Sequence, residues 1–161
     1  MFIPSSLKAT TTFTHIMQTK IPGNGTSPMT VMSLRRHGST PKIEFKVTAG
    51  NVLVGATDLA PLQNSWIDTE VEITNDDAPR GRVRWVVKKG GTTVLDAQKT
   101  GVDTWLGDRV RPKWGIYRSL GDKSGSLQDT HLLLTNMKAY QQTGAAQAGK
   151  PPAPKAIRNA P

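Results

Sequence analysis

Residues 111–118, Arg-Pro-Lys-Trp-Gly-Ile-Tyr-Arg, hold the side chains in this sequence that are best suited to proton transfer. If the segment is a strand, Lys113, Gly115 and Tyr117 point to one face, because side chains alternate along a strand. A lysine charge lowers the pKa of a neighbouring phenol, and a glycine between the two leaves room for a ligand. The segment therefore predicts an acid/base site. The alternative is an ordinary strand with apolar residues in the core and polar residues in solvent.

A second strand-like segment, residues 11–20, carries a histidine and a glutamine. Simple alternation places Phe13, His15 and Met17 on one side and Gln18 on the other. His15 and Gln18 can share a face only if a β-bulge interrupts the strand. Taken alone, His15 is as well explained by a buried, hydrogen-bonded histidine as by a binding group.

Several familiar catalytic and binding motifs are absent from the sequence. It has no cysteine, no GxSxG, no HExxH and no glycine-rich phosphate loop, which excludes disulfides, thiol catalysis and cysteine-type zinc sites. The histidines His15, His37 and His131 are far apart, so a shared metal site would depend on the fold. The carboxylates Glu70 and Glu72 are interpreted as members of a solvated strand face.

The elements that must position these residues are strands, because the apolar spacing is mostly two. The Lys89-Gly-Gly-Thr92 turn predicts a hairpin. No amphipathic helix is evident, and no apolar run approaches the ~20 residues of a membrane helix. We expect an antiparallel all-β sandwich with strands at 11–20, 29–35, 42–47, 66–73, 82–87, 93–96, 113–118 and 130–140.

The chain is basic, with 161 residues and a formal net charge of +9, which indicates an anionic partner. Residues 141–161 contain three basic residues, no acidic residue and four prolines. This composition predicts a disordered tail after one domain at 1–140. Arg82 and Arg84 are interpreted as a solvated strand face, with Trp85 in the core, in preference to a nucleic-acid-binding surface.

The run Lys113–Arg118, the following 129–138 and the strand 14–20 resemble segments of the glucuronan lyase and heparin lyase I-type polysaccharide lyases. The similarity spans roughly residues 11 to 140. It implies a β-jelly roll of the concanavalin A-like kind whose concave face binds an acidic polysaccharide. It also implies an extracellular enzyme that cleaves a uronic-acid polysaccharide by β-elimination.

The resemblance assigns a role to each candidate residue. Tyr117 is expected to be the acid/base group, and Gln18 is expected to hydrogen-bond the substrate carboxylate. Lys113 is expected to support the phenolate, and His15 and Arg35 are weaker candidates for substrate contact. The resemblance implies no cofactor and leaves a structural calcium ion open. The expected partner is an acidic polysaccharide, with neither nucleic acid nor membrane, and the chain is expected to be a monomer.

Two other interpretations stay open because the chain departs from the family pattern. It has fourteen residues before His15, where these lyases have several strands and usually a secretion signal, and its start does not resemble a signal peptide. A non-catalytic carbohydrate-binding module, or a truncated remnant of the same fold, fits this shorter chain. A basic nucleic-acid binder is the third hypothesis, which predicts steep salt dependence with single-stranded DNA.

Overall fold

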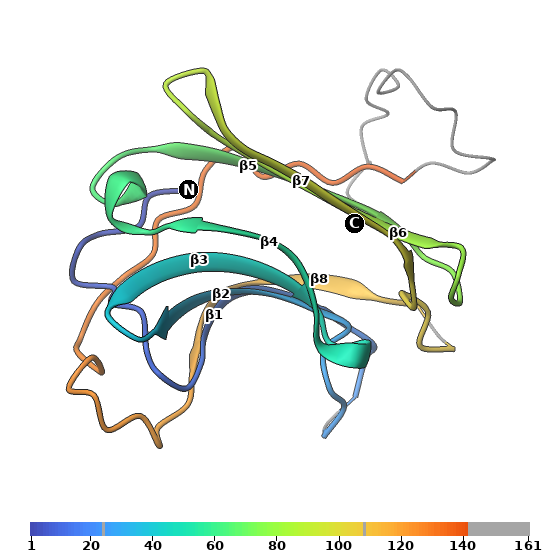
Figure 1. Cartoon of the computed structure of the whole chain (residues 1–161), viewed down its shortest axis with the longest axis horizontal. Coiled ribbons are helices and arrows are strands. Elements are labelled where there is room, and N and C mark those ends of the chain that lie inside the picture. The colour runs from blue at the N-terminus through green and yellow to red at the C-terminus, as the bar shows by residue number, and fades with distance from the viewer. Residues whose placement is uncertain (24, 108, 142–161) are drawn as a thin grey trace, which may run out of the picture.

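The computed structural model describes residues 1–23, 25–107 and 109–141, which form two antiparallel sheets packed face to face (Figure 1). The larger sheet has the order β4-β3-β2-β1-β8 and the smaller has the order β5-β6-β7. The strands are β1 (Thr14–Lys20), β2 (Thr30–His37), β3 (Thr40–Val47), β4 (Val52–Asp58), β5 (Ile67–Thr74), β6 (Gly81–Lys89), β7 (Thr92–Val102) and β8 (Arg111–Arg118). Two short 3-10 helices, η1 (Ala49–Asn51) and η2 (Ala60–Leu62), flank β4. The predicted all-β sandwich is confirmed.

The core lies between the two sheets and follows the alternation of β3 and β6. Phe45 of β3 and Trp85 of β6 are fully buried, and their ring centroids lie 5.9 Å apart. The Trp85 Nε1 donates a hydrogen bond of 2.9 Å to Thr69 Oγ1, so the indole brings no unpaired polar group into the core. Burial of the Phe45 side chain contributes about 1.5 to 3 kcal/mol.

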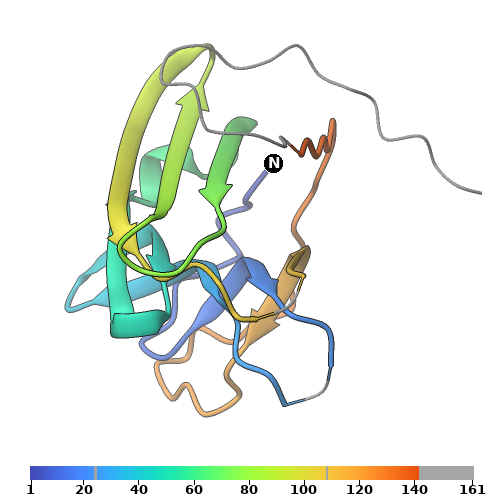
Figure 2. The same cartoon turned by 90° about the vertical axis from the view of Figure 1, so that its right-hand side faces the viewer.

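The two sheets approach most closely where β4 passes β7. A Cβ atom on Gly55 would lie 2.6 Å from the Cβ of Ala97, so only glycine fits there. At the opposite edge of the larger sheet, Trp114 and Ile116 of β8 pack against the core. Leu132 and Leu134, from the segment after β8, pack there with them. Figure 2 shows this segment and the N-terminal segment running beside each other along that side.

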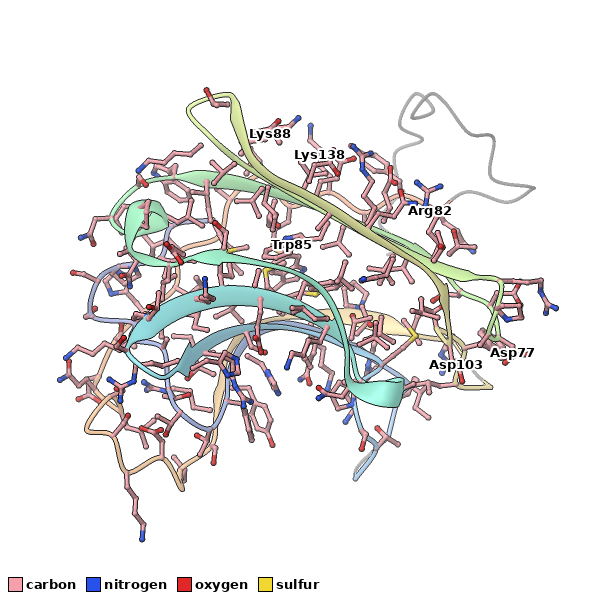
Figure 3. All side chains as sticks on the ribbon, viewed as in Figure 1. Asp77, Arg82, Trp85, Lys88, Asp103 and Lys138 are labelled. Atoms are coloured by element: carbon pink, nitrogen blue, oxygen red, sulfur yellow. The ribbon has the colours of Figure 1, made fainter. Side chains whose placement is uncertain are left out.

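The outer face of the smaller sheet is an ion-paired surface. Arg84 donates bonds of 2.9 and 2.7 Å to the carboxylate of Asp96 and lies 3.9 Å from Glu72. Arg82 donates a bond of 2.8 Å to Gln98. Figure 3 shows Arg82 on the outside of the sheet and Trp85 between the sheets, as their strand parity predicts.

Two secondary-structure expectations differ from the structure. Residues 130–140 are not a strand: Leu133 forms an isolated bridge with Phe2, and Asn136 has a positive φ of 51°, which interrupts an extended chain. Strand β4 is not predicted by the sequence pattern, because Gly55 and Ala56 break its apolar alternation.

The disordered tail was predicted for residues 141–161. Of these residues the structure describes only Gln141. Within the described ranges, none of the helices is long and apolar enough to cross a membrane.

Candidate functional site

The outward face of the larger sheet is concave (Figure 1), and strand β1 within it is irregularly paired. Between His15 and Met17 the register of β1 shifts against both β2 and β8. Ile16 and Met17 are consecutive, yet both are buried in the core. His15 and Gln18 therefore both face outward, which is the effect of a β-bulge. The prediction from simple alternation, with Met17 beside His15 and Gln18 opposite, is wrong for this reason.

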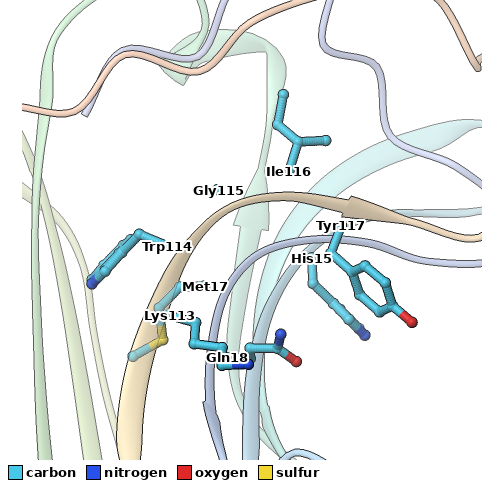
Figure 4. Close-up of a pocket in the computed structure, with 8 residues that line it drawn as sticks. All are labelled: His15, Met17, Gln18, Lys113, Trp114, Gly115, Ile116 and Tyr117. Atoms are coloured by element: carbon cyan, nitrogen blue, oxygen red, sulfur yellow. The ribbon is translucent and has the colours of Figure 1, made fainter. Parts of the chain in front are cut away.

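A pocket of about 180 Å³ lies over this irregular region, between β1 and β8. The strand pairing places Gln18 opposite Lys113 and His15 opposite Tyr117. In Figure 4 these four side chains extend to the concave side, whereas Trp114 and Ile116 point away from it. The residues that line the pocket are His15, Met17, Gln18, Lys113, Trp114, Gly115, Ile116 and Tyr117.

Gly115 allows β8 to accommodate the mismatch with β1. Its φ is 136°, a backbone conformation that residues with a side chain rarely adopt. A Cβ atom placed there would meet no atom within 4 Å. Backbone conformation, and not lack of space, therefore requires glycine at this position, although its missing side chain also keeps the pocket open.

Tyr117 is the most accessible of the candidate side chains. It is 58% exposed, and its ring centroid lies 5.5 Å from that of Phe13 and 6.2 Å from that of His15. Phe13 in turn stacks on His15 at 4.5 Å with an interplanar angle of 15°. The phenol is thus held at the rim of the pocket by an aromatic cluster and presents its hydroxyl to solvent or to a ligand.

The histidine is held in its neutral form. Its Nδ1 lies 2.7 Å from the Ser33 hydroxyl oxygen. Burial lowers the pKa of His15 to about 4, the positive charge of Arg35 acts in the same direction, and the negative charge of Glu44 opposes them. At neutral pH the ring is uncharged, so one of its nitrogens can donate a hydrogen bond and the other can accept one.

Arg35, the fifth predicted residue, lies near the pocket but does not line it. It shares the outward face of β2 with Ser33, and its Nε lies 3.9 Å from a carboxylate oxygen of Glu44. Glu44 is 4% exposed and was not predicted, because the Lys-Ile-Glu-Phe-Lys pattern around it is typical of an ordinary solvated face. No signal in the sequence distinguishes this buried carboxylate from an exposed one.

No protein-family model, curated protein or solved structure matches this chain.

What the site can bind or catalyse follows from the chemistry of its functional groups. The pocket offers a phenol, a neutral imidazole, an amide and the ammonium group of Lys113, a set suited to an anionic ligand and to proton transfer. Among the described residues, no three His, Asp or Glu side chains are grouped so that they could hold a metal ion.

Proposed function

We propose that this chain is a polysaccharide lyase that cleaves a uronic-acid-containing polysaccharide by β-elimination. The observation that carries the proposal is the shared concave face of Gln18, His15, Lys113 and Tyr117 around one pocket. The resemblance of the strands 14–20 and 113–118 to the jelly-roll lyases supports the same reaction, and with it a jelly-roll type of sandwich and an extracellular setting.

The reaction needs a base and an acid near one uronate. The base removes the C5 proton, the electron pair forms a C4–C5 double bond, the bond between C4 and O4 breaks, and a proton is delivered to the departing O4. In our proposal the Tyr117 oxygen, as phenolate, accepts the C5 proton and then donates it to O4. Its exposed position at the pocket rim leaves this oxygen accessible to a sugar.

Removal of the C5 proton also requires stabilisation of the charge that develops on the C6 carboxylate. In our proposal the Gln18 amide donates a hydrogen bond to this carboxylate, and the neutral His15 ring donates a second one. Lys113, opposite Gln18 on the neighbouring strand, supplies positive charge to the carboxylate. Donors fixed before the reaction stabilise developing charge without having to reorganise.

The test is formation of unsaturated uronate ends, followed by ultraviolet absorbance, when the protein is incubated with glucuronan, alginate or heparin-type chains. We expect Tyr117→Phe to lower the rate by about 10²- to 10⁴-fold, because it removes the proton-transfer group. Tyr140→Phe is the matched control, since Tyr140 is 53% exposed and is absent from the pocket lining. A folded wild-type protein that yields no unsaturated product from any polyuronate would falsify the proposal.

A carbohydrate-binding module without catalysis is the second candidate. The observation that favours it is the exposed Tyr117 ring beside Phe13, because exposed aromatic faces stack on sugar rings. This function predicts retention on an immobilised polyuronate, no product, and unchanged retention of Tyr117→Phe.

A further inference from the structure

A group of cations gathers around Glu44 on the concave face, next to the pocket. The Arg35 Nε and the Lys46 Nζ lie 3.9 and 3.5 Å from the same oxygen, Oε1 of Glu44. The His37 Nε2 lies 3.1 Å from the other oxygen. The Glu44 side chain is only 5% exposed, whereas those of Arg35 and Lys46 are 30% and 19% exposed. A buried carboxylate thus draws two partly exposed cations together.

The two cations that converge on Glu44 Oε1 have unused hydrogen-bonding capacity. Their contacts with Glu44 are long ion pairs, and within the described part of the chain neither Arg35 nor Lys46 donates a side-chain hydrogen bond. The Arg35 Nε is buried without a partner. Because this nitrogen is buried, an anionic ligand would bind through the exposed part of the Arg35 side chain and through Lys46.

Three basic side chains elsewhere in the described part of the chain are paired with close carboxylates, whereas Arg36 and Arg118, like Arg35, each have a buried nitrogen without a hydrogen-bond partner. Arg84 and Arg80 each make two short hydrogen bonds to one aspartate. Lys42, on the same face of β3 as Lys46, lies 2.9 Å from Asp58. Arg35 and Lys46, which share one carboxylate at 3.9 and 3.5 Å, therefore differ from the closely paired cations of the outer sheet and of the β3–β4 edge.

The position of these cations relative to the pocket follows from the strand register. Gln18 pairs with Val31, and Val31 pairs with Lys46. Lys46 is thus two strands from Gln18, about 10 Å between Cα atoms at the usual strand spacing. The Arg35 side chain reaches the same Glu44 oxygen from β2, one strand nearer to Gln18. The acidic group of a sugar linked directly to the one over Gln18 and Tyr117 would therefore lie over these two cations.

We propose that Arg35 and Lys46 form a second anion subsite, which binds the carboxylate or sulfate of a sugar next to the reacting uronate. Glu44 is the positioning residue that holds both cations at one point. The inference rests on the proposed function for the identity of its ligand, a polysaccharide with acidic groups on neighbouring sugars. The subsite would favour such a polymer over one in which uronates alternate with neutral sugars.

The experiment measures binding by calorimetry, with the full chain carrying Tyr117→Phe so that the ligand is not consumed. The probes are a glucuronate tetramer, an unsulfated tetramer in which glucuronate alternates with a neutral amino sugar, and the sulfated form of the latter. We expect Lys46→Met to weaken binding of the glucuronate tetramer about tenfold and to change binding of the alternating tetramer less than about twofold. Lys42→Met is the matched control and should change both by less than about twofold.

The sulfated tetramer distinguishes the two anions. A tighter binding that depends on Lys46 shows that sulfate also occupies the subsite and supports the proposal. Equal effects of Lys46→Met and Lys42→Met on every probe would overturn it. Arg35→Gln serves as the second variant if Lys46→Met fails to give a cooperative thermal transition, and it should reproduce the selective loss.

The outcome is separable from that of the lyase assay. If unsaturated product forms but Lys46→Met behaves like its control, the subsite is wrong and the lyase function stands. If no product forms but the Lys46-dependent binding is present, the elimination reaction is wrong and the subsite belongs to a binding protein.

Discussion

His15 and Gln18 are three residues apart on β1, yet both side chains face the concave side of the larger sheet. A regular strand would place them on opposite faces. The register shift between His15 and Met17 turns both Ile16 and Met17 toward the core and so reverses the parity for the rest of the strand. The pocket between β1 and β8 depends on this one irregularity.

The first prediction concerns Gly115, the glycine of β8 that accommodates the register shift between β1 and β8. Gly115→Ala should lower the free energy of unfolding by about 1 to 3 kcal/mol, because alanine is strained at a φ of 136°. Chemical denaturation measures this change. Gly121→Ala is the control, since Gly121 does not have a positive φ and its Cβ would meet only the Ser119 hydroxyl at 3.5 Å. Equal stabilities of the two variants would contradict the conformational role of Gly115.

The second prediction concerns the pH dependence of stability. The folded-state pKa of His15 is about 4, below its ordinary value of 6.5, so the unfolded chain binds the proton more tightly. Between pH 6.5 and 4 the stability contributed by neutral His15 should therefore fall as the pH falls, and above pH 6.5 it should be constant. After allowance for the partial exposure of the ring, the difference is about 1 to 2 kcal/mol.

Denaturation curves at several pH values test the role of His15. His15→Gln should be less sensitive to pH than the wild type in this window. His131→Gln, which changes an exposed histidine, should keep the wild-type profile. An identical pH profile for His15→Gln and the wild type would show that His15 titrates normally.

The third prediction concerns the buried carboxylate. Glu44→Gln should lower the free energy of unfolding by about 1 to 3 kcal/mol, because Arg35 and Lys46 lose the charge between them. Asp58→Asn on the same face is the control. It breaks the exposed pair with Lys42 and should cost less than about 1 kcal/mol. Urea denaturation of both variants checks the difference, and a smaller cost for Glu44→Gln than for Asp58→Asn would argue against a structural role for Glu44.

Much of the fold was predictable from local patterns. The alternation in β3 and β6 identifies Phe45 and Trp85 as core residues, and both are fully buried. The hairpin turn before β7 has positive φ angles at Gly90 and Gly91, as its sequence predicts. Lys113 and Tyr117 were predicted on one face of β8, and both extend to the concave side. These features follow from the residue types and from the two-residue period of a strand.

The sequence by itself determined that this chain forms strands with a core of alternating apolar residues, and that a lysine and a tyrosine share a face. Only the tertiary structure decided that Gln18 joins them, because a bulge arises from the pairing of β1 with two neighbours and leaves no local signature. It also decided that Glu44 is buried and Asp58 is exposed, although each follows the same alternation. Burial depends on which strands and side chains surround a residue, and those neighbours are set by distant parts of the chain.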